Sequence, residues 1–132
     1  TGPGGSVADG AAGMLVARSS DGGLTWDRKS LGISGVNPRL VCLQNGVIAL
    51  GYGRPDLNLI FSEDGGATWR KQIRINRYNE LTAGYLDMVE VSPNRLLLVY
   101  DLQGVAHEGR KINGIFSQFV DVQFDAPATS RP

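Results

Sequence analysis

The chain contains one eight-residue phrase twice, as Ser19-Ser20-Asp21-Gly22-Gly23-Leu24-Thr25-Trp26 and as Ser62-Glu63-Asp64-Gly65-Gly66-Ala67-Thr68-Trp69. Both copies have the pattern S-x-D-G-G-x-T-W, and each follows a short apolar run. The two tryptophans lie 43 residues apart. A repeat of this period is typical of stacked or radial arrays, and it suits a four-stranded propeller blade.

Each residue type in the phrase suits a tight turn between two strands. The Gly pair can take positive φ without a Cβ clash. The Asp carboxylate can accept hydrogen bonds from backbone N–H groups two or three residues later, which fixes the turn. We therefore predict that Asp21 and Asp64 are structural and that each phrase forms a hairpin turn. We also predict that the large rings of Trp26 and Trp69 are mostly buried between neighbouring sheets.

The phrase resembles the Asp-box, or BNR repeat, of the sialidase superfamily, and its copies are named here the first box and the second box. The matching positions are Ser19, Asp21, Gly23, Thr25, Trp26, Ser62, Asp64, Gly66, Thr68 and Trp69. In that family the box is a structural turn between the third and fourth strands of a blade, on the face away from the active site. The resemblance implies an all-β fold, a partial β-propeller of four-stranded antiparallel blades that has six blades when complete.

The length of the chain, 132 residues, fits one domain or part of a larger one. Two boxes account for too few blades to close a ring. We therefore expect residues 1–132 to be the C-terminal part of a single propeller domain, with open apolar sides that the remaining blades cover. Residues 1–12 and 125–132 are expected to be loop or disordered.

The composition argues against several partners. The 13 Lys and Arg residues balance the 13 Asp and Glu residues, so bulk charge does not favour nucleic acid. No apolar run approaches the roughly 20 residues that a membrane helix needs. The one cysteine, Cys42, excludes an intrachain disulfide and a cysteine-rich metal site, and its apolar neighbours predict a buried thiol. We expect no metal and no cofactor.

Short apolar runs separated by turn residues predict strands along the whole chain, and no segment has sustained helical periodicity. The predicted strands are residues 13–18, 26–29, 39–43, 47–52, 57–61, 69–75, 85–91, 96–100 and 115–124. Residues 101–111, which contain the single histidine, His107, are predicted to be a long polar loop. If the boxes lie on the lower face of a propeller, the candidates on its upper face are Arg39, Arg54, Asp56, residues 76–80, Tyr85, Asp87, Asp101, His107, Glu108 and Arg110.

The resemblance also implies roles for these candidates. Gly84-Tyr85-Leu86-Asp87-Met88 looks like the stretch that carries the catalytic tyrosine of sialidases, and Arg54-Pro55-Asp56-Leu57 is similar to a segment with one of the family's three carboxylate-binding arginines. It therefore implies a catalytic Tyr85, with Arg54, Arg39, Asp56 and Asp101 as substrate-binding candidates. A guanidinium suits a carboxylate because it donates two parallel hydrogen bonds. A neutral phenol, deprotonated by a neighbouring Glu, keeps a carboxylate nucleophile away from the substrate's own carboxylate.

The sequence departs from the family pattern at several points. The Phe-Arg-Ile-Pro-type segment, the acid/base aspartate and the glutamate partner of the tyrosine have no match here, and Leu86 replaces a Ser that often follows the tyrosine. Tyr85 can equally be a packed aromatic residue, and Arg54 can equally be an ion-pair partner of Asp56. His107 lacks visible partners for metal or triad chemistry and is expected to be an exposed loop residue.

Three functions remain open at this point. The first is a sialidase-like glycoside hydrolase that acts on terminal sialic acid or a related acidic sugar. The second is a non-catalytic Asp-box propeller that binds glycan or protein, and the third is a structural repeat without a ligand. An arginine, tyrosine and acid cluster on the upper face would favour the enzyme, and the resemblance is compatible with a secreted or extracytoplasmic location.

Overall fold

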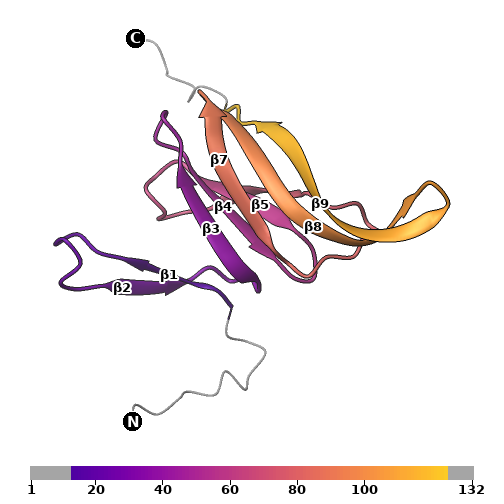
Figure 1. Ribbon diagram of the computed structural model, residues 1–132. Coiled ribbons are helices and arrows are strands. Elements are labelled where there is room, and N and C mark those ends of the chain that lie inside the picture. The colour runs from indigo at the N-terminus through magenta and orange to yellow at the C-terminus, as the bar shows by residue number, and fades with distance from the viewer. Residues whose placement is uncertain (1–12, 125–132) are drawn as a thin grey trace.

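The computed structural model describes residues 13–124, and within this range the chain consists of β-strands and the turns between them (Figure 1). The strands form three antiparallel sheets of two, four and three strands. Within each sheet, strands that are consecutive in sequence are paired. The all-β prediction is therefore confirmed for these residues. The segments 1–12 and 125–132, predicted to be loop or disordered, lie outside the described residues.

The two boxes join neighbouring antiparallel strands, as predicted. The first sheet contains β1 (Leu15–Arg18) and β2 (Asp27–Ser30). The second contains β3 (Val36–Cys42), β4 (Ile48–Gly53), β5 (Asn58–Ser62) and β6 (Arg70–Arg74). The third contains β7 (Leu86–Ser92), β8 (Arg95–His107) and β9 (Arg110–Asp121). The second box therefore lies between the third and fourth strands of a four-stranded sheet.

The four-stranded sheet forms the centre of the molecule because it is covered on both faces. Leu59 and Phe61 pack in one cluster with Leu98 of the third sheet. On the opposite face, Leu50 and Ile60 pack with residues of the first sheet's flanking segments and with Trp69. A strand buried on both faces is apolar at consecutive positions rather than at alternate ones. This burial explains the continuous apolar runs of β4 and β5.

The third sheet is covered on one face only. Along β8, Leu96, Leu98 and Tyr100 are buried, whereas the intervening Val99 is exposed. On β9, Phe119 is also exposed, on the same outer face as Val99. Side chains of a strand alternate between the two faces, so this pattern marks a sheet with one solvent-facing side. The described residues thus leave one face of this sheet, with exposed apolar side chains, uncovered.

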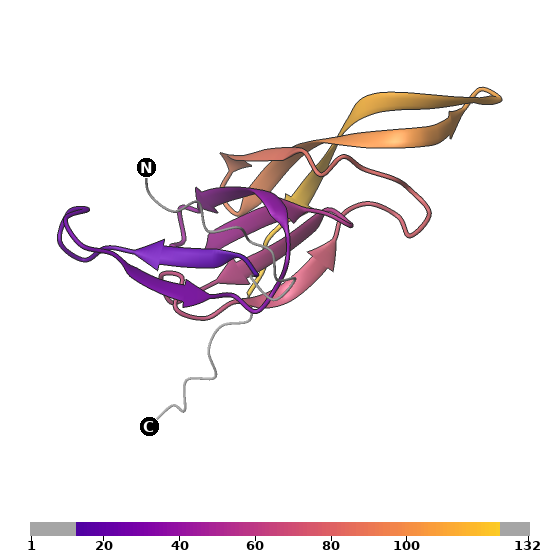
Figure 2. The same ribbon diagram turned by 90° about the horizontal axis from the view of Figure 1, so that it is seen from below.

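The prediction of a polar loop over residues 101–111 is wrong. β8 continues through His107, and the ladder to β9 includes the pair Val105–Ile112. The turn at Glu108-Gly109 has positive φ at both residues, 47° and 75°, as a tight type I′ hairpin turn requires. Gly104 lies at the register shift and interrupts the alternation of apolar residues. The sequence pattern therefore did not indicate that the strand continues beyond it. Figure 2 shows the resulting hairpin extending well beyond the other strands.

The prediction that Cys42 is buried is also wrong, because its thiol is exposed. Val41 packs against the main core cluster. Adjacent residues of a strand point to opposite faces of the sheet. Cys42 therefore points to the side of β3 that the described residues leave uncovered.

Candidate functional site

The two boxes have the same hydrogen-bond pattern, in which each bond joins residues four positions apart. In the first box, Ser19 Oγ accepts a bond from the Gly23 N–H at 2.8 Å, and Asp21 Oδ1 accepts one from the Thr25 N–H at 2.9 Å. The equivalent bonds of Ser62 and Asp64 in the second box have the same lengths. Asp21 and Asp64 thus accept backbone N–H bonds within hairpin turns, as predicted.

The prediction that both tryptophans are mostly buried is wrong for Trp26, whose side chain is 56% exposed. Its indole N–H donates to the Gly23 carbonyl at 3.0 Å, so the ring folds back over its own turn. Trp69 is partly buried because Leu50 and Ile60 of the four-stranded sheet cover it. The first sheet has two strands within the described residues and presents no such surface to Trp26.

We predict that the first box keeps its aspartate ionised in moderately acidic solution. The Thr25 hydroxyl and then the Thr25 N–H lower the pKa of Asp21 from 3.8 to about 2. Because the folded pKa lies below the unfolded one, the stabilisation by the ionised carboxylate is complete above about pH 4 and is lost as the pH falls towards 2. An NMR titration of the Asp21 carboxyl carbon measures this pKa. Thr25→Val should raise the pKa, and a wild-type value near 4 would contradict the geometry.

A cavity of about 710 Å³ opens where β3 meets the outer face of the third sheet. It brings together three of the candidates predicted from the sequence, Arg39, Tyr85 and Asp101. Four strands, β3, β7, β8 and β9, and the segment before β7 contribute to its wall. The complete lining consists of Asn37, Pro38, Arg39, Tyr85, Leu86, Asp87, Val99, Tyr100, Asp101 and Ile115.

Two tyrosines line this cavity, but only Tyr85 offers an accessible side chain. Tyr85 is 59% exposed. Tyr100 is buried, stacks on Phe116 and donates its hydroxyl to Gln118 Oε1 at 3.0 Å. Burial, with a smaller contribution from Glu80, raises the pKa of Tyr100. Tyr85 is therefore the phenol that a ligand in the cavity can reach.

Asp101 fixes the segment that carries Tyr85. Its carboxylate accepts bonds from the Thr82 hydroxyl at 2.9 Å, the Ala83 N–H at 2.7 Å and the Tyr85 N–H at 3.0 Å. Burial alone would raise the pKa of Asp101, but the bonds from Ala83, Tyr85 and Thr82 outweigh it and lower the pKa. The carboxylate therefore stays ionised and holds the entry to β7, which gives it a positioning role beside the predicted substrate-binding one.

The two candidate arginines differ in their surroundings. Arg39 lies on the cavity wall, and its Nε is 3.8 Å from Asp87 Oδ1 in an exposed pair. Arg54 lies outside the cavity lining, and its Nε donates to the Ala83 carbonyl at 3.1 Å. Arg54 thus holds the segment before Tyr85 through its bond to Ala83, and Arg39 is the arginine that lines the cavity.

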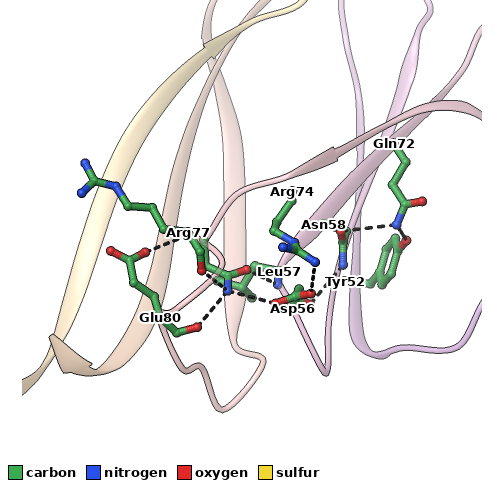
Figure 3. Close-up of polar contacts among 9 residues, drawn as sticks. Tyr52, Asp56, Leu57, Asn58, Gln72, Arg74, Arg77 and Glu80 are labelled. Carbon is green, nitrogen blue, oxygen red and sulfur yellow. Dashed lines mark hydrogen bonds and ion pairs between the residues drawn. The ribbon is translucent and has the colours of Figure 1, made fainter.

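Asp56 lies in a separate polar cluster at the end of β6, which Figure 3 shows. Its carboxylate pairs with Arg74 at 2.8 Å and accepts a bond from Asn76 Nδ2 at 3.1 Å. Asn76 also accepts the Leu57 N–H and donates to the carbonyls of Arg77 and Glu80. Asp56 is therefore paired with Arg74 rather than with Arg54, and the cluster holds the loop that leads to the third sheet.

We predict that Asn76→Asp lowers the free energy of unfolding by about 1–2 kcal/mol, because a second oxygen would replace the amide donor and face three acceptors in a buried place. Asn76 is 3% exposed. Asn113→Asp is the matched control, since Asn113 uses only its Oδ1, as acceptor for the Gly104 N–H. Urea unfolding at pH 7 measures both variants. Equal midpoints for the two would show that the Asn76 cluster contributes little.

The remaining sequence candidates lie away from the cavity. His107 is exposed at the tip of the β8–β9 hairpin. Among residues 13–124, no group of three His, Cys, Asp or Glu side chains is arranged to hold a metal ion, and no helix is long and apolar enough to cross a membrane. Sequence reasoning missed Asn37, Ile115 and the Thr82 hydroxyl, and no local pattern marks them because their partners are distant in the chain.

Searches with protein-family models, among curated proteins and among solved structures found no match.

Proposed function

We propose that this chain is part of a sialidase-like propeller and that the whole protein hydrolyses the bond to a terminal sialic acid or a related acidic sugar. One observation carries the proposal. An exposed tyrosine, Tyr85, shares a cavity of about 710 Å³ with a surface guanidinium, Arg39. A reactive phenol beside a carboxylate-binding group is the combination that this reaction needs.

Each cavity residue has a role in the proposed reaction. Arg39 binds the sugar carboxylate through two parallel hydrogen bonds. The Tyr85 oxygen attacks the anomeric carbon as the glycosidic C–O bond breaks, and water then releases the sugar from the tyrosine. Asp101 and Arg54 hold the Tyr85 segment in place. The base for Tyr85 and the acid that protonates the leaving oxygen come from the remaining blades.

The open sheet face supports a larger array. Beyond the cavity wall, Val89, Val91 and Phe119 form an exposed apolar surface on the third sheet. Within the chain, the four-stranded sheet already packs face to face against the third sheet. We propose that a further blade packs on the open face in the same way, within a six-bladed ring. An apolar surface of this kind marks an interaction site.

The second candidate is a non-catalytic propeller that binds a glycan or a protein. It is favoured by the state of the cavity's own acids. Asp101 accepts three bonds from Thr82, Ala83 and Tyr85, and Asp87 accepts the Met88 N–H. Among the hydrogen bonds of residues 13–124, none joins a carboxylate to the Tyr85 hydroxyl. The described cavity can therefore bind a ligand, but it supplies no base that would activate the Tyr85 hydroxyl.

The two candidates are separated by one assay on the purified protein with all of its blades. A fluorogenic α-sialoside should release its fluorophore, and the matching β-galactoside, which has no carboxylate, should not. Calorimetry with free sialic acid tests binding on the same sample. Binding without release would support the non-catalytic propeller. The absence of both would leave the boxes as a structural repeat without an acidic-sugar ligand.

A further inference from the structure

β9 is a long edge strand that lacks the usual protection against pairing. It has 12 residues and ends the sheet order β7-β8-β9 (Figure 1). Within residues 13–124 it pairs with β8 alone, so its other edge presents free N–H and C=O groups. Natural edge strands are blunted by charges, prolines or bulges. The ladder to β8 shifts register once, opposite Ile112 and Gly114. From Ile115 to Val120, β9 has no register shift, no charge and no proline.

The charges of β9 gather at its two ends with opposite signs. Arg110 and Lys111 begin the strand, and Asp121 ends it. An antiparallel neighbour with the same sequence therefore brings a basic end against an acidic end at both limits of the strand. Asp121 lies 3.5 Å from Arg95 of β8, on the inner side of β9, and 64% of its side chain stays exposed and can meet a second cation.

One register satisfies both the charges and the faces of the sheet. Opposite residues in an antiparallel pair share a face. With Phe116 opposite its own copy, Ile112 lies opposite Val120, and Lys111 lies opposite Asp121 on both sides of the symmetry axis. Residues that are partly buried in one copy, such as Phe116 and Val120, then meet their counterparts on the same side of the joined sheet.

We propose that two copies of this chain pair β9 with β9, antiparallel and in this register, to form one continuous sheet with three strands from each copy. The second copy is the occupant of the edge because its charges complement those of β9 at both ends. The interface is a single strand pair, at the small end of specific interfaces. The dimer is therefore weak, with a dissociation constant on the order of micromolar. This inference does not depend on the proposed hydrolase activity, but it requires that no fourth strand of the same protein pairs with β9.

A charge swap tests the register directly. Sedimentation velocity on the protein with all of its blades, from about 1 to 200 µM, should show a concentration-dependent dimer. Lys111→Glu and Asp121→Lys should each weaken it about tenfold or more, because each places like charges opposite each other twice. The double variant should recover most of the wild-type affinity. Arg110→Glu, which makes the same charge change one residue away and opposite Val122, is the matched control and should have a smaller effect.

Several outcomes would overturn the proposal. A monomer across the whole range would exclude the dimer, and a dimer in which the double variant stays as weak as the single ones would exclude the register. Asp121→Lys also removes the contact to Arg95, but the double variant shares that loss, so recovery remains diagnostic. Hydrogen exchange should show β9 amides that gain protection on dimerisation. Full protection in the monomer would instead mean that a strand of the same protein covers the edge.

Discussion

Tyr85→Phe should lower kcat by about 10³-fold or more and change KM little, in the protein with all of its blades. The substitution removes the nucleophilic oxygen of the proposed mechanism and almost no volume. The ring stays in place because Asp101 holds the Tyr85 backbone on both sides, through the N–H at 3.0 Å and the carbonyl at 3.3 Å. A loss of a reacting atom without a loss of binding appears in kcat rather than in KM.

Tyr100→Phe provides the control for this experiment. It removes the other phenol of the same cavity, whose hydroxyl is bonded to Gln118. We expect turnover within a few-fold of wild type, with a small loss of stability of about 1 kcal/mol from the missing hydrogen bond. Steady-state kinetics with the fluorogenic sialoside measure both variants. Wild-type turnover by Tyr85→Phe would leave the fold unchanged and remove tyrosine-based hydrolysis as the mechanism.

Gly53→Ala should destabilise the protein by about 2–3 kcal/mol and displace the Tyr85 segment. A methyl carbon at position 53 would lie 2.4 Å from both the Cα and the carbonyl oxygen of Gly84. These are main-chain atoms, so the contact cannot be relieved by turning a side chain. Gly84 itself has φ of 90°, which restricts how its segment can move. The end of β4 and the entry to Tyr85 must therefore separate.

The matched control is Gly114→Ala, in β9. There the nearest atom to an added methyl carbon is the Phe116 ring at 3.3 Å, the far end of a side chain that can shift slightly. We expect a change below about 1 kcal/mol. Thermal unfolding compares the two variants. The difference in tyrosine fluorescence between proteins with and without Tyr85→Phe isolates the Tyr85 signal, and a change in this difference on Gly53→Ala reports the displacement. Unfolding of Gly53→Ala at the wild-type temperature would mean that β4 and Gly84 are less closely packed.

The turn of each box could be predicted because its determinants are local. The bonds from Gly23 and Thr25 reach back to Ser19 and Asp21, only four residues away, and depend on no other part of the chain. Short range explains why the two copies fold alike although one adjoins a covered sheet and the other does not. The burial of the tryptophans is different, since Trp26 and Trp69 share one sequence context and differ only in what lies over the ring.

The strands were predictable for the same local reason, and their exact extent was not. The alternation along β7 and the continuous apolar runs of β4 and β5 follow from one-sided and two-sided burial. The extension of β8 and β9 beyond Leu102 depends on pairing across the hairpin, where Gly104 shifts the register. A polar sequence is compatible with either a loop or a solvent-exposed hairpin, and only the partner strand decides between them.

The sequence by itself determined the all-β class, the two box turns and the hydrogen bonds that the box aspartates accept within them. Tertiary structure alone decided which candidates meet. Arg39, Tyr85 and Asp101 come together because β3, β7 and β8 converge on one cavity. Arg54 and Asp56 are near in sequence and yet bind Ala83 and Arg74. Asp101 reaches Thr82, Ala83 and Tyr85 across 16 to 19 residues. Contacts at such separations depend on how the sheets pack, which no local propensity encodes.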